Sequence, residues 1–199
     1  MVGGKELFMF RKFFMIASTA IVMSSSALAA PETYIFEDNH TSITWTANHF
    51  GFSNPSGKFM DVQGSVVLDQ ERPENSKVVA TIKLASIVTG IEKFDNHLKS
   101  IDFFNIEKFP TAKFESTKVI ITHNNTAEVL GILTLLNVSK QVTLYVILNK
   151  IAANPMNKIQ TAGFTATTTI KRSEWGMNYA IPGVSDEVNI LIEAETQKQ

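Results

Sequence analysis

The chain has 199 residues, a formal net charge of −1 at pH 7, and a hydrophobic content of 44%. Its balanced charge, with no basic stripe in the sequence, argues against a nucleic acid as partner. It contains no cysteine, which excludes disulfide bonds, thiolate metal sites, c-type haem attachment and a lipid-modified N-terminal cysteine.

The first residues have the pattern of a secretory signal peptide. Lys5, Arg11 and Lys12 form a basic region, an apolar run follows at 13–23, and Ala27-Leu28-Ala29 fits the small-x-small pattern that signal peptidase recognises. The apolar run is much shorter than the roughly 20 residues that a membrane-spanning helix needs. We therefore predict a cleaved signal peptide at residues 1–29, export to the periplasm, and one mature domain over residues 30–199.

Most of the mature chain alternates between apolar and polar residues. Apolar positions recur at every second residue in runs at 60–68, 78–84, 142–148, 162–170 and 188–194, and further strands are expected near 40–50, 111–122 and 127–136. Turn-forming residues separate these runs at 54–57, 71–75, 123–126 and 154–157. Alternation of this kind is typical of antiparallel strands with one wet face. About eight such strands predict an all-β protein, either a closed barrel or a sandwich.

In the strand expected near 40–50, Ile43, Trp45, Ala47 and His49 share one face. Inside a barrel Trp45 is either a plug or part of the wall. His49 is either a hydrogen-bonded core residue or a ligand contact. The four histidines of the chain show no i,i+2 or i,i+4 spacing, so we predict no metal site.

The stretch after residue 88 departs from the alternation. Thr89-Gly90-Ile91-Glu92 has the pattern of a capping box, in which Thr89 caps a helix and Glu92 reaches back. Ile91, Phe94 and Leu98 then recur at helical spacing, which predicts a short helix through residue 99 that buries all three.

Phenylalanines gather directly after this helix. Residues 100–117 contain Phe103, Phe104, Phe109 and Phe114 around Pro110. Two interpretations remain open, because these rings would either fill an ordinary core beneath the helix or form the wall of an apolar pocket. In a barrel, we expect the inserted helix and aromatic loop to cover one open end.

Residues 86–117, SIVTGIEKFDNHLKSIDFFNIEKFPTAKFEST, resemble the signature of the YceI-like proteins. The segments HTSITWTANHFGFSNPSGKF, GILTLLNVSKQVTL and AGFTATTTIKRSEWGMN also resemble parts of that family, with Asn137 where its turn is expected to hold glycine. The resemblance spans residues 33 to about 195. It implies a lipocalin-like barrel of eight antiparallel strands whose apolar lumen holds a long isoprenoid, either a polyprenyl lipid or an isoprenoid quinone.

The candidate ligand-binding residues on this basis are Trp45, His49, Phe59, Phe94, Leu98, Phe103, Phe104, Phe114, Phe164, Arg172 and Trp175. Arg172 would contact a pyrophosphate or quinone oxygen near the mouth, or it would form a salt bridge with Glu174 or Asp186. Trp175 is expected in a surface aromatic loop.

The sequence therefore favours a periplasmic binding protein that sequesters or carries an isoprenoid lipid, with no metal and no cofactor besides that ligand. Transient membrane contact and a homodimer are compatible with such a role. The alternatives are a small-substrate enzyme or a protein-interaction module on the same barrel. Nucleophile and zinc-protease motifs are absent from the sequence, and its best acid–base pair, Asp95 and His97, is spaced i,i+2 on different faces of the helix. We therefore predict no enzymatic activity.

Overall fold

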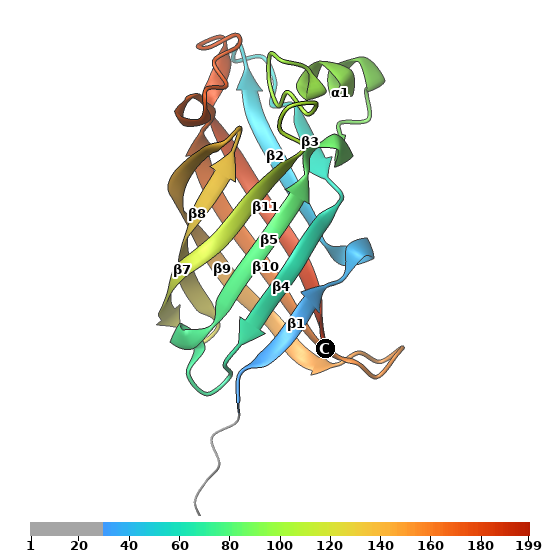
Figure 1. Cartoon of the computed structure of the whole chain (residues 1–199), viewed down its shortest axis with the longest axis vertical. Helices are drawn as coiled ribbons and strands as arrows, with labels where there is room; N and C mark the ends of the chain where they lie inside the picture. Colours follow the sequence, from blue (N-terminus) through green and yellow to red (C-terminus); the bar gives the residue numbers. More distant parts are fainter. Residues whose placement is uncertain (1–29) are drawn as a thin grey trace, which may run out of the picture.

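The computed structural model describes residues 30–199, and the predicted signal peptide at 1–29 lies outside the described residues. The described chain forms one antiparallel sheet with the strand order β1-β4-β5-β7-β8-β9-β10-β11-β2-β3-β6, and a further pairing between β1 and β11 closes it into a barrel (Figure 1). The strands are β1 (Glu32–Phe36), β2 (Ser42–His49), β3 (Ser56–Phe59), β4 (Val62–Leu68), β5 (Lys77–Lys83), β6 (Ile87–Val88), β7 (Thr111–His123), β8 (Thr126–Leu135), β9 (Val138–Ala153), β10 (Gln160–Lys171) and β11 (Val184–Lys198).

Six of these strands are halves of three interrupted ones. β1 and β2 pair with successive parts of β11, and the one-turn helix Asp38–His40 separates them. The next position in the wall is shared by β3, which pairs with β2, and β4, which pairs with β1. The position after that is shared by β6, which pairs with β3, and β5, which pairs with β4. The wall therefore has eight positions. This confirms the predicted eight-stranded antiparallel barrel and excludes the sandwich.

The uninterrupted strands are longer than the sequence runs indicated. β9 has 16 residues and β11 has 15. At roughly 3.3 Å per residue and a tilt of about 40°, strands of this length make a barrel about 35–40 Å tall.

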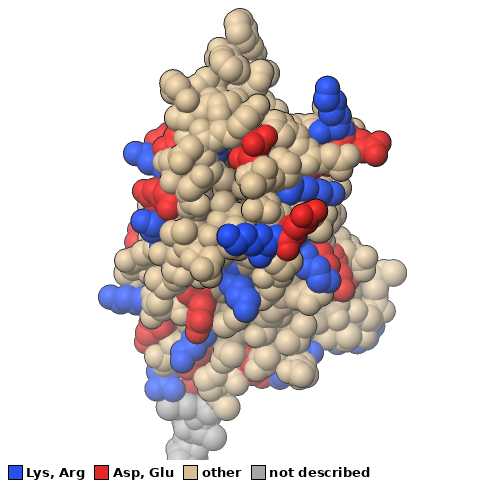
Figure 2. Space-filling model, turned by 45° about the horizontal axis from the view of Figure 1, so that its top comes forward, with Lys and Arg blue, Asp and Glu red and all other residues tan. Residues whose placement is uncertain are grey.

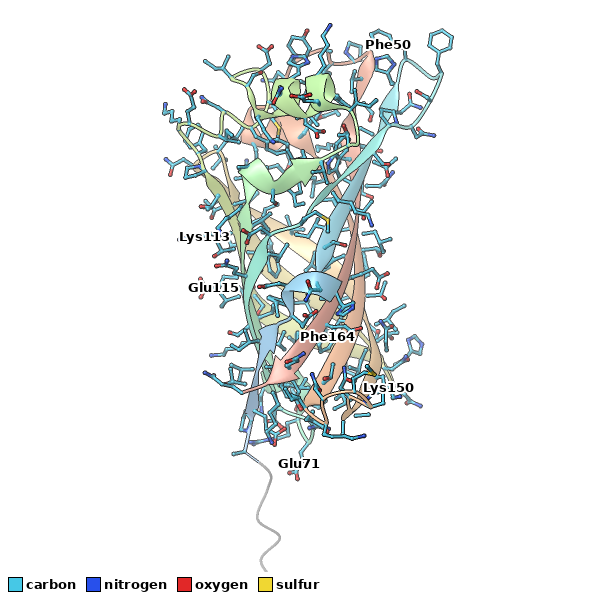
Figure 3. All side chains as sticks on the ribbon, turned by 90° about the vertical axis from the view of Figure 1, so that its right-hand side faces the viewer. Phe50, Glu71, Lys113, Glu115, Lys150 and Phe164 are labelled. Carbon is cyan, nitrogen blue, oxygen red and sulfur yellow. The ribbon has the colours of Figure 1, made fainter. Side chains whose placement is uncertain are left out.

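Alternation along each strand sets what faces the interior. Lys113 and Glu115 of β7 point away from the barrel (Figure 3), while Phe114 between them is buried. The hairpin from β8 to β9 turns at Leu136 and Asn137, which have φ angles of 50° and 61°. Both angles suit a two-residue hairpin turn, and asparagine tolerates this conformation at the position where the family resemblance predicted glycine.

The predicted short helix is present as α1 (Glu92–Lys99). Its start differs from the prediction, since the carboxylate of Asp95, and not that of Glu92, accepts hydrogen bonds from the Thr89 backbone N–H and hydroxyl. Phe94 is half-buried and Leu98 is buried, but Ile91 is 61% exposed, so the prediction that all three are buried is wrong for Ile91. Ile91 sits before the first helical turn, where the extended backbone directs it away from the helix face.

The two ends of the barrel are built from different segments (Figure 1). One end, which we call the α1 end, carries α1, the aromatic loop at 100–110, the β2–β3 loop and the β10–β11 loop. The other, which we call the far end, carries the β4–β5, β7–β8 and β9–β10 turns together with the C-terminus.

A candidate ligand cavity inside the barrel

The barrel encloses a cavity of about 780 Å³, within the range of known ligand pockets. Inward-facing side chains from the strands line it, and most of them are apolar, for example Val62, Val129, Leu144, Ala166 and Ile190. These inward-facing side chains do not fill the lumen of the barrel. The interior remains an apolar space.

Polar lining residues concentrate at the two ends of the cavity. His49, His97, Arg172 and Tyr179 lie at the α1 end, while Ser76, Lys77 and residues 123–126 lie at the far end. The cavity therefore extends along the barrel from one end to the other.

Ten of the eleven residues predicted from sequence to bind a ligand line this cavity. They are Trp45, His49, Phe59, Phe94, Leu98, Phe103, Phe104, Phe114, Phe164 and Arg172. The predicted inward face of β2 is confirmed as well, because Ile43, Trp45, Ala47 and His49 all contact the lumen. Whether these side chains contact a ligand stays a prediction.

Trp45 forms part of the wall and does not plug the tube. Its ring packs against Gly57 on the neighbouring strand, where an added Cβ would lie 2.7 Å from the indole. It also makes an edge-to-face contact with Phe94, with ring centroids 6.1 Å apart. Its indole Nε1 is buried and has no hydrogen-bond partner within residues 30–199.

The aromatic residues around α1 serve both as core and as cavity wall. Phe59 packs edge-on against Phe104 at 5.4 Å. His97, Phe103 and Tyr179 form a three-ring cluster with centroid distances of 5.1–5.3 Å, although they come from α1, the aromatic loop and the β10–β11 loop. All five side chains also line the cavity, so the two interpretations left open by the sequence are both correct in part.

The YceI-like domain family matches residues 34–196. The chain belongs to the YceI-like family. A UPF0312 protein of Pseudomonas putida (strain W619) is 35% identical over 183 residues, which cover 90% of this chain and 94% of the relative. The Campylobacter jejuni YCEI protein is 30% identical with a TM-score of 0.70, covering 76% of this chain and 90% of that one. A polyisoprenoid-binding domain from Saccharophagus degradans, implicated in plant cell wall breakdown, is 12% identical with a TM-score of 0.64, covering 83% and 98%, and shares the fold.

Arg172 of this YceI-like protein is occupied by its own chain. It is 4% exposed, and its guanidinium donates hydrogen bonds of 2.9–3.0 Å to the carbonyls of Met177, Val184 and Ser185. Burial lowers the pKa of Arg172, and the negative charge of Asp186 opposes this shift. Arg172 therefore holds the β10–β11 loop in place.

The salt bridge predicted as an alternative for Arg172 does not form among the described residues. Asp186 instead accepts hydrogen bonds from the backbone N–H and the hydroxyl of Ser173, at 2.8 and 2.7 Å. The backbone hydrogen bond is the main reason that the pKa of Asp186 lies below its ordinary value.

Trp175 does not line the cavity, and the prediction of a surface aromatic loop there is wrong. It is 2% exposed and belongs to a one-turn helix, Arg172–Trp175, that packs against the wall. Its Nε1 donates to the carbonyl of Leu133 at 3.3 Å. Burial of the large ring, together with a partner for its N–H, explains this position.

The histidines at the α1 end lie on the rim. His49 is exposed and contacts the ring of Phe50 edge-on at 4.8 Å, so the expectation of a hydrogen-bonded core histidine is wrong. His97 Nε2 lies 3.0 Å from the carboxylate of Asp102, and not beside Asp95, whose carboxylate is used by Thr89.

Thr168 and Tyr179 are among the cavity-lining residues that were not predicted from the sequence. Thr168 lines the cavity on β10, and within residues 30–199 its hydroxyl has no hydrogen-bond partner. The period-two pattern of β10 was sufficient to predict its inward position, because Thr168 lies between Ala166 and Ile170. Tyr179 belongs to an irregular loop, for which the pattern carries no signal.

Within the described part of the chain, no group of three or more histidine, cysteine, aspartate or glutamate side chains is placed to hold a metal ion. None of the helices in residues 30–199 is long and apolar enough to cross a membrane.

Proposed function

We propose that this YceI-like protein binds a long isoprenoid lipid, either a polyprenyl lipid or an isoprenoid quinone, and carries or stores it in the periplasm. The observation that supports this proposal most directly is the apolar cavity of about 780 Å³ that extends along the barrel. The related fold from Saccharophagus degradans, named for polyisoprenoid binding, adds a precedent for this architecture.

The energetics of such a ligand favour the tail over the head group. An isoprene unit has five carbons, and burying it contributes on the order of 3–4 kcal/mol at about 0.8 kcal/mol per methylene. Association costs roughly 4–15 kcal/mol, so about four buried units offset that cost. One hydrogen bond to the head group adds only about 0.5–1.5 kcal/mol. A cavity with few free polar groups is consistent with recognition of this kind.

The hydroxyl of Thr168 is the best candidate to contact an oxygen of the ligand inside the lumen. Arg172 is less suited, because three of its N–H groups already donate to backbone carbonyls. An unpaired hydroxyl in apolar surroundings is costly, and a ligand carbonyl or hydroxyl would satisfy it.

Native mass spectrometry of the purified protein tests the proposal. Protein stripped of lipid is incubated with a quinone or a polyprenol of at least four isoprene units, and we expect one ligand bound per chain. Protein that stays empty, both as purified and after incubation, contradicts the proposal.

A matched pair of variants on β10 tests whether the lumen is the site. Ala166 lines the cavity, whereas Thr167 beside it faces outward and is exposed. Ala166→Trp fills part of the lumen and should reduce lipid uptake by at least about tenfold, while Thr167→Trp should leave uptake unchanged. Equal uptake by the two variants would place the ligand elsewhere.

Export and the lack of turnover are separate parts of the proposal. Fractionation of cells that express the full chain should recover the processed protein in the periplasm, and recovery of the unprocessed chain in the cytoplasm contradicts export. The predicted absence of enzymatic activity fails if bound lipid is chemically converted and if His97→Ala abolishes that conversion.

A further inference from the structure

Large apolar side chains are exposed at the α1 end. Phe52 in the β2–β3 loop is 89% exposed, and Phe50 in the same loop and Tyr179 in the β10–β11 loop are also exposed. Ile91 and Ile101 are exposed on either side of α1. We call these five residues the rim patch.

The loops that carry Phe50, Phe52 and Tyr179 contain no formal charge. Neither residues 49–57 nor residues 176–185 include a lysine, arginine, aspartate or glutamate. The backbone N–H of Phe50 donates to the carbonyl of Gly183 at 2.7 Å, which holds the two loops side by side. Figure 2, with the α1 end turned forward, shows an uncharged projection at the top of the molecule, with charged residues below it and to its right.

The rim patch is continuous with the cavity. His49, Phe50, Pro55, Tyr179 and Ala180 belong to the two uncharged loops and also line the lumen. Phe50 lies at this end of the molecule in Figure 3. Apolar surface therefore continues from the lumen to the exposed side chain of Phe52, with no charged residue of these loops between them.

We propose that the rim patch docks on the surface of a lipid bilayer, with Phe52 inserted, so that lipid passes between the bilayer and the barrel without crossing water. This inference rests on the proposed function, because a lipid ligand gives the mouth of the cavity a reason to face a membrane. Exposed aromatic side chains are favoured at the boundary between head groups and hydrocarbon.

The shape and charge of the patch favour a bilayer over a protein partner. Phe52 makes no ring contact among the described residues and is 89% exposed, whereas anchors of protein interfaces lie in packed pockets surrounded by polar residues. The two loops lack lysine and arginine, and beside Ile91 and Ile101 the basic residues Lys93 and Lys99 are balanced by Glu92, Asp95 and Asp102, so attraction to anionic head groups contributes little. Binding should then depend on neither anionic lipid nor salt.

Sedimentation with phosphatidylcholine vesicles tests docking, using protein purified after expression of the full chain. Phe52→Ser should weaken vesicle binding at least about tenfold, since it removes one large inserted side chain. Met156→Ser is the matched control, because Met156 is 90% exposed in the β9–β10 turn at the far end. It should leave binding unchanged, as should high salt or added phosphatidylglycerol.

Three results would overturn the docking proposal. The first is an absence of vesicle binding by the unsubstituted protein, and the second is equal loss in Phe52→Ser and Met156→Ser. The third is a concentration-dependent dimer that Phe52→Ser abolishes, since the patch would then bind a second copy of the chain.

A second measurement separates this inference from the proposed function. A quinone with about four isoprene units is supplied either as a soluble cyclodextrin complex or inside phosphatidylcholine vesicles. Phe52 does not line the cavity, so Phe52→Ser should take up the dissolved quinone normally but extract it from vesicles at least about tenfold more slowly. Uptake from neither source by the unsubstituted protein would refute the proposed function, whereas uptake from solution without vesicle binding would refute docking alone.

Discussion

The far end of the barrel is stabilised mainly by contacts within single turns, whereas the α1 end is stabilised by contacts between separate segments of the chain. At the far end the β4–β5 and β9–β10 turns satisfy their own backbone, as where the buried carboxylate of Asp69 accepts the N–H groups of Glu71 and Arg72. At the α1 end the β10–β11 loop depends on Arg172, and the aromatic loop packs through rings from three separate segments. Loops with few buried apolar contacts open most readily, and the loops of the α1 end carry the exposed side chains Phe50, Phe52 and Tyr179. We therefore expect ligand exchange at the α1 end.

Replacing Arg172 should give the largest effect and show how far the α1 end depends on one side chain. Arg172→Met leaves three carbonyls without their charged donor, and such hydrogen bonds contribute roughly 1.5–3 kcal/mol each before relaxation. We expect the free energy of unfolding to fall by about 3–5 kcal/mol, measured by urea denaturation. The free energy of unfolding of Arg172→Lys should lie between those of the unsubstituted protein and Arg172→Met, because an ammonium group cannot reach all three carbonyls. A loss below about 1 kcal/mol in Arg172→Met would contradict the role of Arg172.

Substitutions of Phe103 and Phe164 compare the effects of the α1 end and of the interior on the rates of ligand exchange. Phe103→Ala removes two of the three ring contacts that hold α1, the aromatic loop and the β10–β11 loop together, each worth about 0.5–1.5 kcal/mol. We expect ligand association to become about tenfold faster, and release to become faster still, because Phe103 also lines the cavity. Phe164 lines the cavity on β10, nearer the far end (Figure 3), so Phe164→Ala should speed release alone. Stopped-flow tryptophan fluorescence measures both rates, and the same pattern in both variants would argue against a gate at the α1 end.

Thr168 tests at which end the polar part of the ligand lies. Thr168 is paired across β11 with Ile190, which is paired in turn with Trp45 in the half of the barrel nearer the α1 end. If the head group lies at this level, Thr168→Val should weaken affinity by roughly twofold to tenfold. Thr41→Val is the control, because Thr41 lines the cavity but its hydroxyl already donates to the carbonyl of Glu195. Unchanged affinity in Thr168→Val would move the head group elsewhere, with the far end as the next candidate.

Acid should lower the stability of both ends of the barrel, by less than the substitutions described above. The backbone N–H of Arg72 lowers the pKa of Asp69 below its ordinary value of 3.8, and the backbone N–H of Ser173 does the same for the pKa of Asp186. A carboxylate whose pKa is lowered in the folded state stabilises the protein at any pH above its ordinary pKa. This stabilisation is lost as the pH falls through the folded-state pKa. Urea midpoints should therefore drop below about pH 4, and less steeply in Asp69→Asn and Asp186→Asn. A midpoint that stays constant from pH 7 to pH 3 would contradict this expectation.

The sequence predicted the wall of the barrel better than its ends, for a physical reason. A strand with one dry face shows its inward positions directly, so Trp45, Phe114 and Phe164 were correctly placed on the lumen. The division of three strands into halves was not predicted, because the pattern continues across a short break such as Asp38–His40.

The residues placed wrongly all depend on contacts distant in sequence or on irregular backbone. Trp175 is buried against the carbonyl of Leu133, on a strand that the chain leaves about forty residues earlier. Arg172 lines the cavity as predicted, but its partners were not, because they are carbonyls of a loop that has no periodic pattern. Ile91 fits the helical spacing but precedes the helix, and local spacing alone does not show where α1 begins.

The different surroundings of Trp45 and Trp175 give the protein a built-in optical probe. These are the two tryptophans of the chain, and only Trp45 borders the lumen. Replacing Trp175 with phenylalanine leaves one fluorophore facing the ligand. A quinone ring nearby accepts an electron from the excited indole and quenches its fluorescence, whereas a polyprenol lacks such an acceptor. Emission from that single indole would thus tell the two classes of cargo apart without a label.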